Sequence, residues 1–419
     1  MGGVVVVGAG LAGLNAARVP ARAGVGSVVL AAEDEVGGRV RTDVVGGVRF
    51  DRGFQILLPA YPELADVDLD ALDLRHFRPG AFVHRGGRRD LLADPRDGLH
   101  AVRGALGQHV LGVRDLVAPA GISLRDLAGP ARAITSAPDR TTREELGRWL
   151  SDDAVDTVLR PFLAGVFLER ELTTSSRFFH LVWRSFARGG AALPALGMGE
   201  LPRLLARGLD VRLGARVVAV RSDGVEPAGG ERVAADHVVI ATDGSAADRL
   251  WPGLGAPAWH GVTTWYFRPP APPLRDPTLV VDGDGGGPVV NTAVLSEVSR
   301  AYSPDAPLVQ ASVLDEATEA EVRSHPGVLY GTPVEEWETL ARYDVPHALP
   351  VANAPHPLRR AVRLAPRRYV CGDHRDTPSI QGALVSGRRA ARAVLADLGV
   401  RQVQGDQVQG DQVQGDQVQ

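Results

Sequence analysis

The chain has 419 residues, with 46 basic and 50 acidic side chains and a formal net charge of −4. Every basic residue is arginine, and the lack of lysine excludes a Schiff-base enzyme, a lysine-containing phosphate loop and a lysine general base. The near-neutral charge gives no reason to expect a nucleic-acid partner or binding to an anionic membrane surface. The single cysteine, Cys371, fits a reducing cytoplasm. The apolar start, 4–14, is interrupted by glycines and suits neither a signal peptide nor a membrane span, so we expect a soluble, cytoplasmic protein of two or three domains.

The N-terminal region shows a strand, a glycine-rich turn, a helix and a second strand in close succession. The β-branched run Val4–Val7 is typical of a strand buried in a parallel sheet, and Ser27–Leu30 repeats the pattern. Between them a helix is predicted from Leu11 to about Ala23, and Pro20 should kink or end it. The later predicted elements are helices over 143–150 (capped by Thr141 or Thr142), 152–168 and 201–209, strands over 211–221 and 232–241, an antiparallel sheet within 259–313, a strand over 368–371 and a helix over about 381–398.

The glycine-rich turn carries the first chemical signal. Residues 8–13, Gly-Ala-Gly-Leu-Ala-Gly, match G-x-G-x-x-G between a predicted strand and a predicted helix. Such glycines allow a tight turn and a close approach of the backbone to a pyrophosphate, which the helix N-terminus then attracts. Alone the motif is weak, but its strand, helix and downstream acidic residues make it a strong dinucleotide signature.

A second motif, residues 34–42, follows the second strand and contains Gly37, Gly38 and Arg39. Together the two motifs resemble the signature of the superfamily of flavin amine oxidases, protoporphyrinogen oxidases and carotenoid (phytoene) desaturases. The resemblance implies non-covalently bound FAD, with Arg39 near its phosphates. A guanidinium fork suits phosphate oxygens, whereas the bland alternative is a surface arginine after a turn.

The resemblance continues along most of the chain. Segments 50–55, 160–167, 193–199, 236–242, 372–373 and 379–387 are similar to family segments in the same order. It implies that the backbone at Gly53–Gln55 passes the flavin ring, that Asp373 binds the ribityl chain and that a helix N-terminus lies under the pyrimidine. The cofactor-binding residues expected in this way are Gly8, Gly10, Leu11, Ala12, Gly13, Glu33, Gly37, Gly38, Arg39, Gly53, Phe54, Gln55, Val218, Gly372, Asp373, Ile380, Gln381 and Ala383.

Two positions depart from the family pattern. Ala31 stands where the family has a glutamate that binds the ribose, and Pro20 stands where it has an ordinary helix former. Glu33 is the nearest carboxylate that could replace the missing one. We expect FAD to bind, with Glu33 or water in that role.

The resemblance implies hydride transfer from an organic substrate to the flavin. Because many amine oxidases of the family use a lysine and this chain has none, the leading interpretation is dehydrogenation or desaturation of a fairly apolar small molecule. Flavin amine oxidation and protoporphyrinogen oxidation are alternatives within the class. A non-redox or non-catalytic flavin-fold protein is the alternative from another class.

Few side chains offer themselves for catalysis. His374 follows Gly372-Asp373 and could act as a base near the flavin, although a histidine hydrogen-bonded in a loop is equally expected. Trp265 and Tyr266 could line the substrate cavity or belong to the core, and Cys371 fits a buried thiol better than a flavin attachment. No residue spacing indicates a metal site or a Ser–His–Asp triad.

These inferences define an α/β protein with two domains. The predicted FAD-binding domain is Rossmann-like, has a parallel sheet and comprises 1–75, 195–250 and 355–400. The predicted α+β substrate domain, with an antiparallel sheet, comprises 76–194 and 251–354. Residues 401–419 repeat Gln-Val-Gln-Gly-Asp without a core-forming pattern, which predicts a disordered tail. The sequence does not indicate an oligomeric state.

Overall fold

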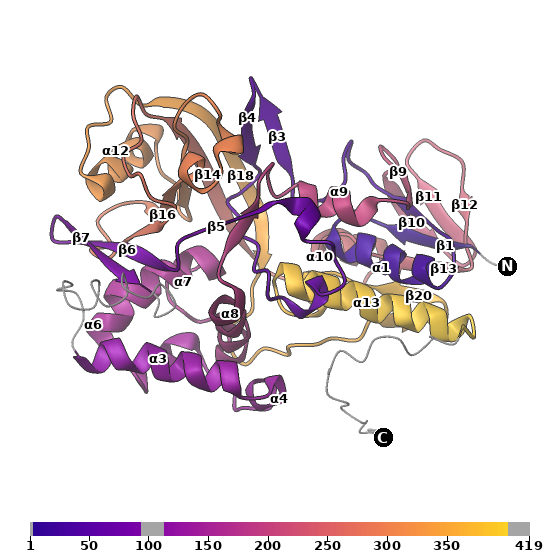
Figure 1. The fold of residues 1–419 in the computed structure, drawn as a ribbon. Helices are drawn as coiled ribbons and strands as arrows, with labels where there is room; N and C mark the ends of the chain where they lie inside the picture. The colour runs from indigo at the N-terminus through magenta and orange to yellow at the C-terminus, as the bar shows by residue number, and fades with distance from the viewer. Residues whose placement is uncertain (1–2, 94–112, 401–419) are drawn as a thin grey trace.

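The computed structural model describes residues 3–93 and 113–400 of the chain (Figure 1). The predicted tail, 401–419, lies outside the described residues. No helix in these two ranges combines the length and the apolar character needed to span a bilayer.

One sheet has the order β19-β20-β13-β1-β2-β9. Its strands are β1 (Val4–Val7), β2 (Ser27–Leu30), β9 (Asp210–Arg212), β13 (His237–Ile240), β19 (Arg363–Ala365) and β20 (Arg368–Val370). Neighbouring strands pair in parallel except at the edge, where β19 runs antiparallel to β20. The parallel sheet of a Rossmann-like fold, predicted from the β-branched runs, is therefore confirmed.

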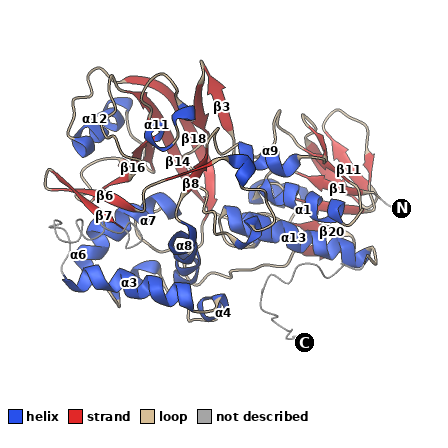
Figure 2. Cartoon of the chain, viewed as in Figure 1, coloured by secondary structure: helices blue, strands red, loops and turns tan. Residues whose placement is uncertain are grey.

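Both faces of this sheet are covered, which explains why all four residues of β1 are buried. Val4 and Val6 face α1 (Leu11–Arg22) and α13 (Ile380–Asp397), two helices that lie side by side in Figures 1 and 2. Val5 and Val7 face the opposite side and contact the small sheet of β10 (Val217–Arg221), β11 (Gly224–Pro227) and β12 (Val233–Ala234). Helix α10 (Gly244–Leu250) also packs on that side through Leu250.

Several predicted boundaries were wrong. The single strands predicted over 211–221 and 232–241 are each two strands in different sheets, β9 and β10 and then β12 and β13. Gly214, with φ of +67°, turns the chain between the first two. The helix predicted over 201–209 is α9 (Glu200–Ala206), and Leu209 belongs to the turn before β9. Pro20 ends α1 only two residues later, at Arg22.

A second sheet has the order β18-β14-β17-β16-β15-β6-β7. Its strands are β6 (Gly80–Arg85), β7 (Arg88–Ala93), β14 (Trp259–Arg268), β15 (Leu279–Asp282), β16 (Val289–Val294), β17 (Val309–Val313) and β18 (Glu338–Pro350). It is antiparallel as predicted, apart from one parallel pair, β15 with β6, that joins two distant segments. Helix α12 (Glu319–Tyr330) covers its outer face through a cluster that includes Trp265, Phe267 and Trp337.

A helical lobe, drawn at the lower left of Figure 1, completes the molecule. It contains α3 (Val113–Ala128), α4 (Ala131–Thr135), α5 (Thr142–Gly147), α6 (Asp152–Ala154), a π-helical turn (Val155–Leu159), α7 (Arg160–Phe167) and α8 (Ser176–Gly189). Thr141 caps α5 in a capping box with Glu144, as the sequence predicted for Thr141 or Thr142. The single helix predicted over 152–168 corresponds to three consecutive helical segments, α6, the π-helical turn and α7.

Short elements connect the two large sheets and the helical lobe. They are the hairpin β3 (Thr42–Val45) and β4 (Val48–Asp51), the pair β5 (Leu74–His76) and β8 (Ala192–Pro194), helix α11 (Leu295–Val298), and the single helical turns Pro62–Leu64, Asp70–Leu72, Arg300–Tyr302 and Asp373–Arg375. Strands β5 and β8 pair where the chain leaves and re-enters the proposed FAD-binding domain. The division into two domains, with the boundaries given above, remains a proposal.

Candidate functional site

A cavity of about 1530 Å³ runs from the end of the parallel sheet to the helical lobe. Small-molecule pockets commonly enclose roughly 300–1,000 Å³, so this cavity has room for more than one ligand. One end, the cofactor chamber, is lined by the glycine-rich turns and the ends of β1, β2, β10 and β13. The other end, the apolar chamber, is lined by six aromatic side chains, Phe54, Phe77, Phe162, Phe178, Trp183 and Phe186, among aliphatic ones.

The first glycine turn forms the floor of the cofactor chamber. Gly8 has a φ of +113°, and a β-carbon there would lie 2.7 Å from Ala241 O. A β-carbon on Gly13 would lie 1.9 Å from Gly8 O, so Gly13 allows the helix to pack but does not itself line the cavity. Helix α1 begins at Gly10 without a side-chain cap and without an acidic residue in its first turn. Its free N–H groups therefore favour an anion at this position.

The second glycine turn lies directly against the first. Gly37 N donates to Ala9 O over 2.8 Å, and Gly10 and Gly37 form a parallel bridge. From the end of this turn Arg39 reaches the opposite wall, where Nη2 contacts Asp373 Oδ1 at 2.8 Å and Nη1 donates to Ala348 O at 2.9 Å. The structure thus brings together the two N-terminal motifs and the C-terminal Gly372-Asp373 motif.

Residues 53–55 also line the cavity. Gly53 has a φ of +89°, and Phe54 N donates to Thr264 Oγ1. Gln55 donates from Nε2 to Arg39 O at 2.9 Å, while its buried Oε1 has no partner among the described residues. A buried acceptor without a donor is costly, so this oxygen calls for a ligand N–H group.

The C-terminal motif contributes Gly372, Asp373, Ile380 and Ala383 to the cavity wall. Gly372 takes a φ of +150°, and its N–H donates to Ser386 Oγ of α13. Gln381 is turned away, since its Oε1 accepts from Glu63 N and it is not among the lining residues.

The adenosine side of the chamber lacks a well-placed carboxylate. Ala31 lines the wall at the end of β2 and is 3% exposed. Glu33 also lines the cavity, but its side chain is 60% exposed and lies 3.8 Å from Arg41 Nη1. Val218 lines the same end and is 56% exposed. Both Glu33 and Val218 can therefore be reached by a ligand.

His374 lies behind the cavity wall. It is not among the lining residues, and β-carbons on Gly372 and Gly244 would strike its ring. Among the described residues neither buried ring nitrogen has a partner, and burial lowers the pKa of His374 to about 4, so the ring is neutral at pH 7. A catalytic role for His374 stays a prediction.

Three other candidates belong to the core. Trp265 packs in the cluster under α12, and Tyr266 donates from its hydroxyl to Asp51 O at 2.7 Å. Cys371 is fully buried, and desolvation raises the pKa of its thiol. None of the three lines the cavity described here.

One cluster was not expected from the sequence. His84, Asp282 and Asp284 bring three possible metal-ligand atoms within 4.8 Å of one another. However, Asp282 already accepts from Asp284 N and Gly286 N and contacts His325 Nε2 at 3.1 Å, while Asp284 accepts from Gly86 N. These bonds account for the cluster as a structural tie between β6 and β15.

The aromatic wall of the apolar chamber was also missed. Its main source is α8, whose apolar residues Phe178, Val182 and Phe186 recur at helical spacing behind the N-cap Ser175. That spacing was present in the sequence and could have identified the helix.

The fold and the two glycine turns define a dinucleotide-binding protein, and the residues present fit FAD: a pyrophosphate suits the open N-terminus of α1, and a flavin ring carries an N–H group that suits Gln55 Oε1. A family model for flavin-containing amine oxidoreductases matches residues 11–395. The chain belongs to this family and is an FAD-dependent oxidoreductase.

Solved structures share the fold at low sequence identity. A protein from Exiguobacterium, named as a candidate protoporphyrinogen oxidase, is 18% identical with a TM-score of 0.70, over 95% of this chain and 99% of that one. A putrescine oxidase bound to putrescine is 18% identical with a TM-score of 0.67, over 94% and 99%. A reduced UDP-galactopyranose mutase is 15% identical with a TM-score of 0.67, over 94% and 96%. No curated protein matches the chain in sequence.

Proposed function

We propose that the protein dehydrogenates or desaturates a largely apolar small molecule held in the apolar chamber. The observation that carries this proposal is the chamber wall, in which the six aromatic side chains are joined by aliphatic ones such as Val166. A bound flavin would supply the acceptor for a hydride equivalent from the substrate.

The chain's own residues would bind the FAD and enclose the substrate. The residues we propose to hold FAD are those expected from the sequence that line the cavity, with the N-terminus of α1 and Arg39 serving the phosphates and Asp373 the ribityl chain. Gly13 and Gln381 would act by positioning, Gly13 through close packing and Gln381 through Glu63. The aromatic wall would exclude water from the reacting carbon.

Polar groups around the apolar chamber support an apolar substrate. Asp115 lines it, but both carboxylate oxygens are engaged, by Ser151 N and Ser151 Oγ at 2.9 Å each. Ser123 accepts from Trp183 Nε1. A lysine is absent from the whole chain, so lysine-assisted amine oxidation has no residue to carry it. We also propose that the enzyme works in the cytoplasm, which its lone buried cysteine suits.

The test is an anaerobic titration of the FAD-loaded protein with a polyene, a porphyrinogen and putrescine, followed by the visible spectrum. We expect the flavin bands to bleach with the polyene and not with putrescine. Bleaching by the amine alone would contradict the proposal. Readmitting oxygen then separates an oxidase, whose bands return at once, from a dehydrogenase that needs another acceptor.

A matched variant tests the chamber itself. Phe162 packs edge-on against Phe186 with ring centroids 5.7 Å apart. Phe162→Asp should abolish bleaching by the polyene while the flavin content stays unchanged, because Phe162 lies in the apolar chamber. Loss of FAD in this variant would show that the two chambers cannot be separated.

A further inference from the structure

The apolar chamber contains a buried amide whose nitrogen has no hydrogen-bond partner among the described residues. Asn291, on β16, lines the cavity and is 3% exposed. Its neighbour Thr292 points to the opposite face of the sheet, where its hydroxyl lies 3.1 Å from Tyr330 Oη of α12. Because side chains alternate along a strand, Asn291 faces α7 and the cavity.

The orientation of this amide is set by the next strand. Asn291 Oδ1 accepts from Gln310 Nε2 at 3.2 Å, and Gln310 Oε1 in turn accepts from Ser312 Oγ at 3.3 Å. The hydrogen bond from Gln310 orients the amide oxygen toward β17, so the Nδ2 group points away from Gln310. Within the part of the chain that the structure describes, Nδ2 has no hydrogen-bond partner.

Gly165 keeps the space beside this donor open. It lies on α7, lines the same cavity, and a β-carbon on it would lie 2.0 Å from Asn291 Nδ2. Any other residue at position 165 would cover or displace the amide. A fixed N–H donor without a protein partner therefore stands in a wall that is built mainly of apolar side chains.

We infer that the substrate carries a neutral carbonyl-type oxygen that accepts a hydrogen bond from Asn291 Nδ2. This inference rests on the proposed function, because it places the substrate in the apolar chamber. A bare hydrocarbon would leave the donor unpaired, whereas a carbonyl group would satisfy it. Asn291 is thus a specificity-determining residue that selects oxygenated apolar molecules.

The test compares two probes with the same carbon skeleton, benzophenone and diphenylmethane, by equilibrium dialysis against the FAD-loaded enzyme. We expect the wild type to bind benzophenone at least about tenfold more tightly, which corresponds to 1.4 kcal/mol. Asn291→Leu, which keeps the size and removes the donor, should lose that preference. Val166→Ala, a change in the same wall without a polar group, should alter both affinities alike and keep their ratio.

A spectroscopic readout serves if Asn291→Leu does not fold. The carbonyl stretch of isotope-labelled benzophenone bound to the wild type should lie below its frequency in hexane, as a hydrogen-bonded carbonyl does. A hexane-like frequency, or equal binding of the two probes by the wild type, would overturn the inference. A separate titration of the FAD-loaded protein with the polyene reports on the proposed function, and failure of the polyene to bleach the flavin would leave the probe preference intact.

Discussion

Asp51 is the buried carboxylate at which the β3–β4 hairpin, the second sheet and the segment before α9 meet. It is 1% exposed and accepts from Thr42 Oγ1, Met198 N at 3.0 Å and Tyr302 Oη at 2.6 Å. Burial raises its pKa from 3.8 to about 6, although these three donors oppose the shift. The folded protein therefore holds this proton more tightly than the unfolded chain.

The consequence is a defined pH dependence. Because the folded pKa is raised, the contribution of Asp51 to stability is fully present below about pH 4 and is lost as the pH rises through about 6. Asp51→Asn keeps an acceptor for Thr42 and Met198 without the charge. Relative to the wild type, its free energy of unfolding should therefore rise by roughly 2 kcal/mol between pH 4 and pH 7. Denaturant titrations across this range measure the difference; Asp344→Asn, at an exposed site, is the control. A pH-independent difference would contradict the expectation.

Ala31 provides a second prediction at the scale of one residue. Ala31→Glu places a carboxylate on the cavity wall at the end of β2, where two ribose hydroxyls could be bound. The variant should retain more FAD than the wild type after dilution and gel filtration, measured as the ratio of flavin to protein absorbance. Ala32→Glu, one position along the chain, should have a smaller effect because its side chain starts from an exposed position. Unchanged FAD retention in Ala31→Glu would count against the assignment.

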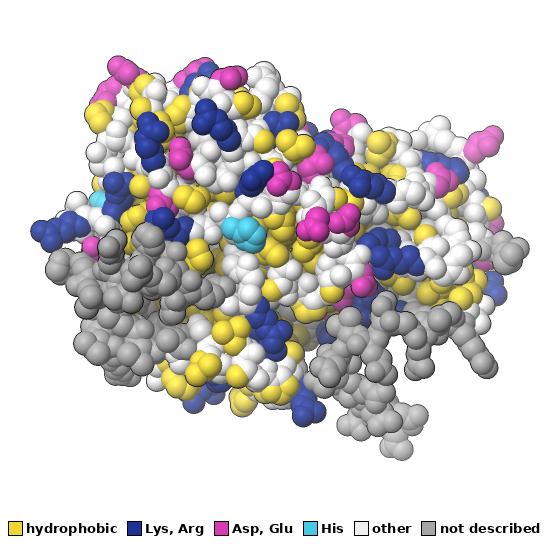
Figure 3. Space-filling model, in the orientation of Figure 1, with side chains coloured by type: hydrophobic (Ala, Val, Ile, Leu, Met, Phe, Trp, Pro, Cys, Tyr) yellow, Lys and Arg dark blue, Asp and Glu magenta, His cyan; other side chains and the backbone are white. Residues whose placement is uncertain are grey.

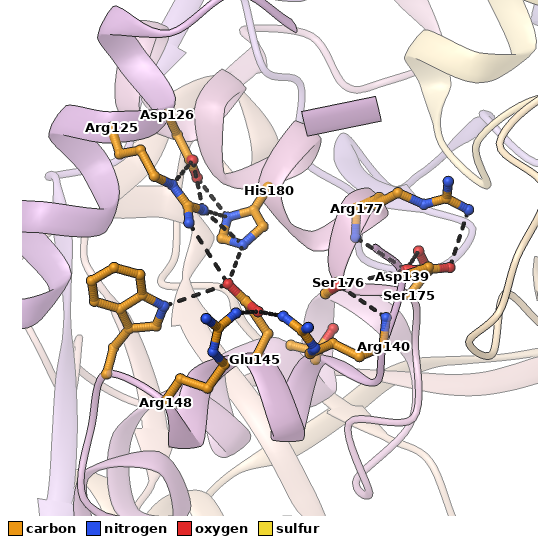
Figure 4. Close-up of polar contacts among 12 residues, drawn as sticks. Arg125, Asp126, Asp139, Arg140, Glu145, Arg148, Ser175, Ser176, Arg177 and His180 are labelled. Atoms are coloured by element: carbon orange, nitrogen blue, oxygen red, sulfur yellow. Dashed lines mark hydrogen bonds and ion pairs between the residues drawn. The ribbon is translucent and has the colours of Figure 1, made fainter. Parts of the chain in front are cut away.

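At the scale of elements, α3 is fixed to α8 by a network of buried charges (Figure 4). Asp126 of α3 lies 2.7 Å from His180 Nδ1 of α8, and His180 Nε2 lies 3.5 Å from Glu145 of α5. Burial alone would raise the pKa of Glu145, but hydrogen bonds from Arg140, Trp149 and Arg148 lower it to about 2. The network therefore places the carboxyl groups of Asp126 and Glu145 around His180 and joins three helices.

Breaking this network should loosen one wall of the cavity. Asp126→Ala removes the partner of His180, and losing one side of a buried pair typically costs about 3–5 kcal/mol. Because Asp126 ties α3 to α8, hydrogen exchange in α3 should accelerate more than in α1, which is outside the network. Ser123 and Leu127 of α3 line the apolar chamber, so the same change loosens that wall. Asp248→Ala, on α10 of the proposed FAD-binding domain, is the control. Equal acceleration in both helices would show that the network does not hold α3 in particular.

The elements also show what a sequence can predict. The β1–α1–β2 unit was predicted nearly to the residue, because its β-branched runs and glycine turn are local signals. Helices α3 and α8 were not predicted, although the apolar spacing of α8 was legible. The break between β9 and β10 was missed because both halves are rich in valine and only the partner strands, β2 and β11, distinguish them.

At the scale of the whole molecule, the cofactor chamber was predictable in composition and the apolar chamber was not. Sixteen of the eighteen expected cofactor residues line one cavity, and most of them belong to glycine-containing motifs that are continuous in sequence. The apolar chamber is assembled from β6, α3, α7, α8 and β16, whose pairing has no local pattern. Asn291 illustrates what the sequence alone does not reveal. The orientation and accessibility of its amide depend on Gln310 and Gly165, which lie on other elements.

On the face of the molecule drawn in Figure 3, positive and negative side chains are mixed. Figure 3 shows acidic and basic side chains interspersed over the face drawn, with hydrophobic side chains between them. The near-neutral balance read from composition thus holds locally on this face as well. Small-molecule binding in the interior therefore owes little to long-range attraction by the surface.

The order of strands in the parallel sheet has a consequence for how the protein is made. Strand β1 pairs with β13, which pairs with β20, so residues 4–7, 237–240 and 368–370 must all be present before the sheet is continuous. A ribosome that has released only the first two hundred residues has delivered β1 and β2 with an unsatisfied backbone edge. The nascent chain must keep that edge from pairing wrongly until residues 368–370 have been translated, and FAD can find its complete site only after that point.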